Sequence, residues 1–162
     1  MKKYELTAEF IEKWGKKLFR IKALISFGSV EAGELGGYIE KEDNLAHDGN
    51  AWVSGNARVS GNAWVYGNAR VSGDAEVSGD ARVYGDAEVS GNADYLLIGR
   101  IGSRFSFTTF FKNKDKGITV SCGCFLGTIA EFRAKVTDTH GNNKHAKIYN
   151  LAADMAELQI LG

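Results

Sequence analysis

Residues 51–92 read AWVSGN, ARVSGN, AWVYGN, ARVSGD, AEVSGD, ARVYGD, AEVSGN, a run of seven hexads without an insertion. Every hexad has Ala first, Val third, Gly fifth and Asn or Asp last. A period of six matches neither the 3.6-residue period of a helix nor the two-residue period of a simple strand. The repeat therefore predicts a unit made of one short strand and one turn.

Each residue type in the hexad suits one part of such a unit. Valine is β-branched and fits a short strand with its side chain turned inward, while its neighbours point outward. Glycine followed by Asn or Asp tolerates left-handed backbone angles, so the chain can turn a corner there. Alanine is small enough to fill the inside of that corner. The repeat thus accounts for much of the high glycine content, 20 in 162 residues.

The unit resembles the hexapeptide repeat of left-handed parallel β-helices, in which an aliphatic residue is followed four positions later by a small one. In that family three hexads make one triangular coil. The resemblance implies a mainly β fold with a short left-handed parallel β-helix of about three coils. An independent check comes from the position after each valine, which reads Ser, Ser, Tyr over every three hexads and places Tyr66 under Tyr84.

Outward residues that lie three hexads apart share a face of such a helix. We expect ion pairs across two of the faces, between Arg58 and Glu76 and between Arg70 and Glu88. The first face carries Trp52, Arg70 and Glu88, the second Arg58, Glu76 and Asp94, and the third Trp64, Tyr66, Arg82, Tyr84 and Arg100.

The third face combines aromatic rings with arginines. This composition is typical of interface hot spots and also of surfaces that stack nucleobases. Because hexapeptide-repeat helices commonly trimerise side by side, we expect a homo-oligomer, with a trimer favoured, that uses this face as its subunit interface. A ligand-binding or partner-binding face and a plain surface are the alternatives.

The flanking segments predict end caps, which a β-helix needs because its last coils expose unpaired strand edges. Residues 3–25 alternate apolar and polar around Trp14 and Gly15, which predicts that residues 1–37 form a β-hairpin cap with a solvated, lysine-rich tip. Residues 38–94 hold the β-helix, in which His47 takes the aliphatic position of an imperfect first hexad.

Residues 95–162 predict an α+β cap of two or three strands and two helices. The sequence from Thr128 to Glu131 has the form of a capping box, so the first helix is expected to start there. Cys122 and Cys124 are the only cysteines, and we expect them to be reduced, buried thiols of a cap strand.

Short motifs in the flanks carry a second resemblance. They are GELGGYIEKEDNL (33–45), IGSR (101–104), TTFF (108–111), CGCF followed by GT (122–128) and TH (139–140). With these motifs the chain resembles small hexapeptide-repeat proteins of phages and prophages of Gram-positive bacteria. The resemblance implies a viral accessory protein made in a bacterial cytoplasm. Such proteins include inhibitors of host defence, which block an enzyme or sequester a nucleotide signal.

The formal net charge is zero, with 20 Lys and Arg against 20 Asp and Glu, which excludes a globally basic nucleic-acid binder and a polybasic membrane anchor. No signal peptide or membrane-spanning segment is recognised, so a cytoplasmic location is expected. The charge is unevenly spread, at +2 for residues 1–37, −6 for 38–94 and +4 for 95–162. The C-terminal cap therefore remains open to anionic partners.

A modest anion-binding signal supports this possibility. Ser103 and Arg104 follow a glycine, Thr128 stands at the expected helix start, and Arg100 and Lys112 are near in sequence. Free N–H groups at helix N-termini bind phosphates. The plainer interpretation of the same residues is a turn and an N-cap.

Other reactive residues give only weak support for an enzymatic function. His47 could act as the general base of an acetyl-CoA-dependent acyltransferase, but its core position favours packing. Cys122, Cys124, His140 and His145 could form a Cys2His2 zinc site, although the CxC spacing is unusual for zinc. We therefore predict no catalytic residue, no metal and no cofactor.

Together these observations predict a non-enzymatic, phage-type accessory module that binds or inhibits a host protein and acts against a bacterial defence. The first alternative is sequestration of a nucleotide or another anionic small molecule between subunits, and the second is an acyltransferase. The residues expected to bind a ligand or form the interface are Trp64, Tyr66, Arg82, Tyr84, Arg100, Ser103, Arg104 and Thr128.

Overall fold

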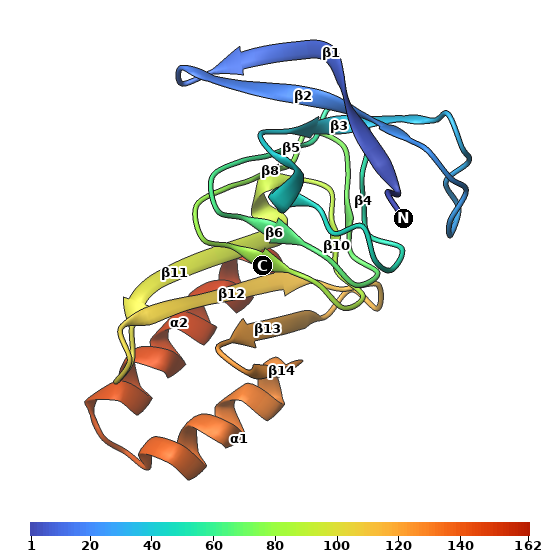
Figure 1. Ribbon diagram of the computed structural model, residues 1–162. Coiled ribbons are helices and arrows are strands. Elements are labelled where there is room, and N and C mark those ends of the chain that lie inside the picture. The colour runs from blue at the N-terminus through green and yellow to red at the C-terminus, as the bar shows by residue number, and fades with distance from the viewer. The chain divides into compact units, whose positions relative to one another are not determined.

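The structure, a computed structural model, describes residues 1–162 and divides into two compact units, Met1–Asn92 and Ala93–Gly162. Figure 1 shows a long hairpin and many short strands in the first unit, and a sheet with two helices in the second. The fold is therefore mainly β, with parallel sheets and a small C-terminal helical part, as the sequence predicts.

Each hexad folds into a two-residue strand that ends on its valine. The seven valines and the seven alanines of the repeat are at most 1% exposed, so they form a continuous core. The strands are β4 (Trp52–Val53), β5 (Arg58–Val59), β6 (Trp64–Val65), β7 (Arg70–Val71), β8 (Glu76–Val77), β9 (Arg82–Val83) and β10 (Glu88–Val89).

Strands β4, β5, β6 and β7 each pair in parallel with the strand three hexads later in the chain. Trp52 lies opposite Arg70, Arg58 opposite Glu76 and Trp64 opposite Arg82. The strands of the repeat are thereby sorted into three groups, with the orders β4-β7-β10, β5-β8 and β6-β9. This register confirms the predicted eighteen-residue spacing.

The glycines allow neighbouring corners of the repeat to come very close. Gly67 has a left-handed φ of +70°, and a Cβ at this position would stand 3.0 Å from the backbone nitrogen of Gly85. Asn68 N–H donates to the carbonyl of Gly85 at 3.0 Å, so the ladder continues through the turn. A residue larger than glycine would have to push the two turns apart.

The predicted hairpin is present and extends one sheet of the repeat. Strands β1 (Tyr4–Lys13) and β2 (Lys16–Ala23) are antiparallel and joined by Trp14 and Gly15. Strand β3 (Leu35–Ile39) pairs with β2 on one side and with β5 on the other, and a short 3-10 helix, η1 (Glu42–Asn44), follows it. Figure 1 shows the hairpin continuing the sheet of β3, β5 and β8.

The hexad position of Trp52 predicts an outward, exposed side chain, but in the structure this side chain is buried. It is only 6% exposed, because Phe27 and Tyr4 pack edge-on against its indole at ring centroid distances of 5.4 and 6.5 Å. The buried ammonium of Lys3 donates to the carbonyl of Ala51 at 2.7 Å beside it. Residues before the repeat thus cover Trp52, while Arg70 and Glu88 of the same face stay exposed. A repeat-based prediction does not foresee this covering.

The second unit is built on an antiparallel sheet of four strands, not the two or three expected. They are β11 (Tyr95–Ile101), β12 (Ser106–Lys112), β13 (Ile118–Cys122) and β14 (Phe125–Thr128), in that order. The additional strand is β14, which is paired with β13 across the short turn at Gly123 and Cys124. A 3-10 helix, η2 (Asn92–Asp94), marks the end of the repeat.

Two helices, α1 (Ile129–His140) and α2 (Lys144–Ile160), complete the second unit. The predicted capping box is confirmed, since Thr128 Oγ1 accepts from Glu131 N–H at 3.1 Å and the Glu131 carboxylate accepts from Thr128 N–H at 3.0 Å. The helices pack on the sheet through one core, which contains Phe110, Val120, Phe132, Val136, Tyr149, Ala153, Ala156 and Ile160.

Three further expectations need correction. Arg100 does not join the face of Trp64 and Arg82, because it lies on β11, which pairs with β12. Cys124 is exposed in the turn after β13, and Cys122 is only half-buried. The hairpin tip is not fully solvated, since Lys13 contacts the carboxylate of Glu76.

No helix of the chain is long and apolar enough to cross a membrane.

We predict that Gly67→Ala lowers the free energy of unfolding by more than Gly15→Ala does. Both glycines have a left-handed φ, so each substitution costs roughly 1–2 kcal/mol of backbone strain. Only Gly67 adds a collision with the next corner, whereas a Cβ at Gly15 meets nothing within 4 Å. Chemical denaturation of the two variants measures the difference, and equal losses would contradict the close stacking of the corners.

Candidate functional site

Four of the predicted interface residues come together on strands β6 and β9 and in the turns that follow them. The rings of Trp64 and Tyr66 stack with centroids 3.9 Å apart, and those of Tyr66 and Tyr84 with centroids 4.3 Å apart. Arg82 lies in register with Trp64 on the neighbouring strand. These four residues form what we call the aromatic face.

The aromatic face is partly open to solvent. Trp64 remains 40% exposed, although it is a large apolar side chain. Burial within the stack raises the pKa of Tyr66 to about 12, with a further contribution from Tyr84, while the charge of Arg82 acts in the opposite direction. The stack is therefore a preformed apolar surface with a cation beside it.

The second place where predicted residues gather is a cavity of about 390 Å³ in the second unit. We call it the C-terminal cavity. Ser103 and Arg104 contribute to it from the turn between β11 and β12, as the anion-binding hypothesis requires. The complete lining is Ser103, Arg104, Ser106, Cys122, Gly123, Cys124, Phe125, Phe132, Lys135, Val136, Thr139, His140 and Tyr149.

The Lys, Arg, Asp and Glu residues that line the C-terminal cavity are all basic. Arg104 and Lys135 supply two cations, and none of the thirteen lining residues is Asp or Glu. Hydroxyl groups of Ser103 and Thr139 add hydrogen-bond donors. The cavity therefore offers an anion charged and neutral donors without a competing carboxylate in its lining.

Aromatic side chains form another part of the lining. Tyr149 stacks with His140 at a centroid distance of 5.8 Å and meets Phe132 edge-on at 5.6 Å. Burial and Cys122 raise the pKa of Tyr149 to about 12, while Arg104 acts in the opposite direction. The phenol of Tyr149 is thus neutral at ordinary pH, and it lines the same cavity as Arg104.

Close packing fixes this part of the cavity. A Cβ on Gly102, whose φ is +82°, would collide with the phenol oxygen of Tyr149. The turn that carries Ser103 and Arg104 therefore rests directly on helix α2. Three sequence motifs, IGSR, CGCF and TH, together supply eight of the thirteen lining residues.

The other residues that were predicted to bind an anion do not line this cavity. Thr128 caps α1, and because its backbone N–H and hydroxyl bind Glu131, they lower the pKa of that carboxyl. Arg100 is exposed on β11, with its guanidinium 5.7 Å from the ring centre of Phe107. Lys112 lies 3.7 Å from the carboxylate of Asp94.

Sequence reasoning missed Lys135, which completes the pair of cations. The signal was available, because Phe132, Lys135, Val136 and Thr139 follow the spacing of one helix face, and all four line the cavity. The sequence did not reveal that this face of α1 lines the same cavity as the turn with Arg104.

Residues considered for catalysis are engaged elsewhere. His47 stacks on Tyr4 at 4.3 Å, its Nδ1 accepts from Lys3 N–H at 3.1 Å, and its Nε2 lies 3.7 Å from Glu42. Cys122 accepts a hydrogen bond from the hydroxyl of Thr108 at 3.2 Å. No group of three or more His, Cys, Asp or Glu side chains is close enough together to hold a metal ion.

The comparisons with known proteins bear on the repeat. A family model described as the YdcK beta solenoid repeat matches residues 51–67 and 63–79. No curated protein matches the chain. The chain thus contains a β-solenoid repeat, and its similarity to phage or prophage proteins stays a prediction.

Proposed function

We propose that the chain is a non-enzymatic binding module that holds an anionic small molecule in its C-terminal cavity. The observation that carries the proposal is the cavity lining, which contains the two cations Arg104 and Lys135 and no carboxylate among its thirteen residues. Hydrogen bonds to charged groups are about twice as strong as neutral ones, and an arginine side chain can grip a phosphate with two of them.

The proposed ligand combines an acidic group with a planar part. Phe125, Phe132, His140 and Tyr149 provide ring surfaces next to the cations. A volume of about 390 Å³ lies within the range of about 300–1,000 Å³ that is usual for small-molecule sites. A nucleotide has this chemistry, since its base stacks on aromatic rings and its phosphate binds arginine.

The contacts of His47 support binding without catalysis. An acyltransferase base must be able to take a proton from its substrate. In this chain Nδ1 of His47 already accepts from a backbone N–H, and its ring is stacked on Tyr4. The acyltransferase alternative therefore has less support than the binding proposal.

The biological role that we propose is that of a phage-type accessory protein in the bacterial cytoplasm, which sequesters a nucleotide signal of host defence. The motifs IGSR, CGCF and TH belong to those that carry the resemblance to phage and prophage proteins. Because they supply most of the cavity lining, the same residues link the resemblance to the proposed site. The alternative role is that the protein binds and blocks a host defence protein.

We also propose that the repeat winds as a left-handed β-helix of about three coils with a cap at each end. The spacing of eighteen residues between paired strands supports the triangular coil. The pairing of β3 with both β2 and β5 supports a cap role for the hairpin, since it covers a sheet edge that would otherwise be open. The α+β unit is the proposed cap at the other end.

A trimer that uses the aromatic face is the proposed assembly. Aromatic residues beside an arginine are enriched in interface hot spots. The partial exposure of the stacked Trp64 supports this use of the face.

For the ligand, we predict that a panel of nucleoside monophosphates, diphosphates and cyclic phosphates contains a binder. Arg104→Ala and Lys135→Ala should each weaken its affinity by about ten-fold to a hundred-fold, because each removes a charge-assisted hydrogen bond. Arg100→Ala is the matched control, since Arg100 does not line the cavity. Isothermal titration calorimetry measures all three variants. Absence of any binder, or equal binding by all variants, would refute the proposal.

For the assembly, we predict that Trp64→Lys combined with Tyr66→Lys converts the protein to monomers, because buried like charges would meet at the interface. Leu24→Lys is the control, since Leu24 is similarly exposed, at 41% against 40% for Trp64, but lies outside the aromatic face. Sedimentation velocity reports the mass. An unchanged mass in the double variant would exclude this face as the interface.

A further inference from the structure

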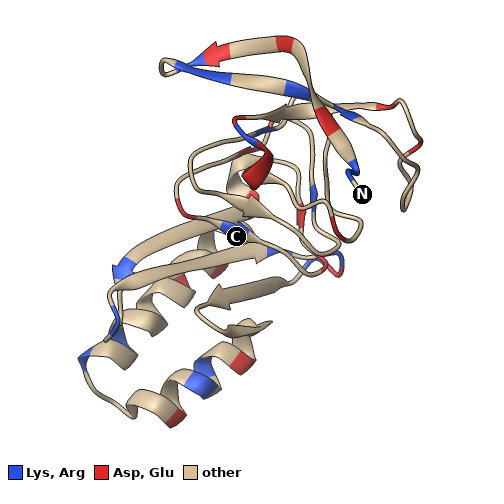
Figure 2. Cartoon of the chain, viewed as in Figure 1, with Lys and Arg blue, Asp and Glu red and all other residues tan.

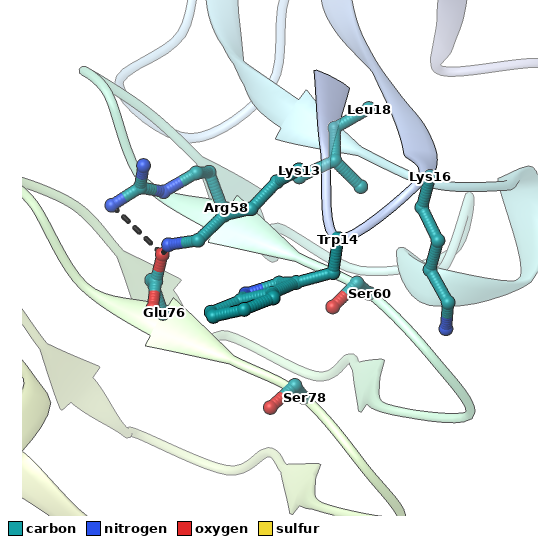
Figure 3. Close-up of a pocket in the computed structure, with 8 residues that line it drawn as sticks. All are labelled: Lys13, Trp14, Lys16, Leu18, Arg58, Ser60, Glu76 and Ser78. Atoms are coloured by element: carbon teal, nitrogen blue, oxygen red, sulfur yellow. Dashed lines mark ion pairs between the residues drawn. The ribbon is translucent and has the colours of Figure 1, made fainter. Parts of the chain in front are cut away.

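A second pocket, separate from the C-terminal cavity, lies in the first unit where the hairpin tip meets the repeat. Its volume is about 210 Å³, and we call it the hairpin-tip pocket. Lys13, Trp14 and Lys16 reach it from the hairpin, while Arg58 and Glu76 reach it from strands β5 and β8. Figure 3 shows Lys13 and Arg58 converging on Glu76 on one side of the Trp14 indole and Lys16 on its other side. The hydroxyl of Ser60 lies beside the indole and that of Ser78 below it.

Positive charge is in excess around this pocket. The carboxylate of Glu76 lies 2.9 Å from the guanidinium of Arg58 and also contacts the ammonium of Lys13. The third cation, Lys16, lies 3.5 Å from Glu40, which is not part of the lining. Figure 2 shows the basic segments on both sides of the hairpin turn. Three cations thus share a lining that contains one carboxylate.

The pKa of Lys13 is consistent with crowding of like charges. Burial lowers this pKa, and the neighbouring guanidinium of Arg58 lowers it further. An added anion would reduce the repulsion between the two cations.

Tryptophan is an unusual residue for the turn position that Trp14 occupies in the hairpin. It has a φ of +55° in a two-residue turn with Gly15, a position where Asn, Asp or Gly is normally found. A left-handed tryptophan costs roughly 1–2 kcal/mol, and the side chain recovers little by packing because the residue is 89% exposed. Figure 3 shows its indole extending toward Glu76, as one wall of the pocket. Strained residues that persist without a packing benefit are often found at ligand sites.

We propose that the hairpin-tip pocket binds a small aromatic acid, with its ring on the indole of Trp14 and its acidic group beside the cations that line the pocket. The size of the pocket restricts the ligand to about one ring and one acidic group, because about 210 Å³ is below the usual range for larger ligands. The hydroxyls of Ser60 and Ser78 also line the pocket, where they can bind polar substituents of the ring. This site does not depend on the C-terminal cavity, which belongs to the other unit.

The test uses phenyl phosphate and benzoate as probes on the full chain. Phenol and inorganic phosphate serve as half-ligands, since each lacks one of the two recognised groups. We expect the complete probes to shift the indole N–H signal of Trp14 in a ¹H–¹⁵N NMR spectrum and to saturate, and the half-ligands to bind at least ten-fold more weakly.

The informative variant is Trp14→Asn, because asparagine suits a left-handed turn and the hairpin should fold as well as before or better. We expect it to raise the midpoint of chemical denaturation and to weaken binding of phenyl phosphate at least ten-fold, as measured by calorimetry. Lys16→Gln should also weaken binding, whereas Lys17→Gln should not, since Lys17 lies over the ring of Phe10 instead. Arg104→Ala should leave this site unchanged, which separates it from the function proposed above.

Two results would overturn the proposal. One is that neither complete probe binds at millimolar concentration. The other is that Trp14→Asn binds phenyl phosphate as well as the natural chain does.

Discussion

The backbone ladder that joins each hexad to the hexad eighteen residues later is the constraint on which the first unit depends. Trp52 N–H donates to Ala69 at 3.0 Å and Ser54 N–H to Val71 at 2.8 Å, and the same pattern continues through the repeat. Because the strands are only two residues long, no strand is stable alone, and each exists through its neighbours. The ladder also places chemically similar positions above one another, which creates the stacked Tyr66 and Tyr84.

Local signals explain what the sequence could predict. The repeat, its eighteen-residue register, the hairpin and the capping box at Thr128 all depend on residues close together in the chain or on strict periodicity. Features set by distant contacts were missed, such as the burial of Trp52 beneath the residues that precede the repeat and the exposure of Cys124 in a turn. The C-terminal cavity was half predicted, because Arg104 was named but its partner Lys135 was not.

The two proposed sites use the same chemistry in different ways. Both place aromatic rings beside clustered cations, although the formal net charge of the chain is zero. In the C-terminal cavity no lining carboxylate answers Arg104 and Lys135, whereas in the hairpin-tip pocket Glu76 already holds two cations. The first site is therefore suited to the more strongly charged ligand. The second relies more on the exposed ring of Trp14 and suits a smaller one.

The most direct test of the ladder is a disulfide between positions eighteen residues apart. Ser54→Cys with Ser72→Cys, in a chain whose two natural cysteines are replaced by serine, places the two thiols directly after the paired parallel strands β4 and β7. Such strands lie about 4.8 Å apart, within the range that a disulfide can span. Ser60→Cys with Ser72→Cys is the control, because these positions are twelve residues apart and belong to different sheets. The account predicts that mild oxidation gives an intramolecular disulfide, detected by mass spectrometry, in the first variant and none in the second. A disulfide in the control with none in the first variant would contradict it.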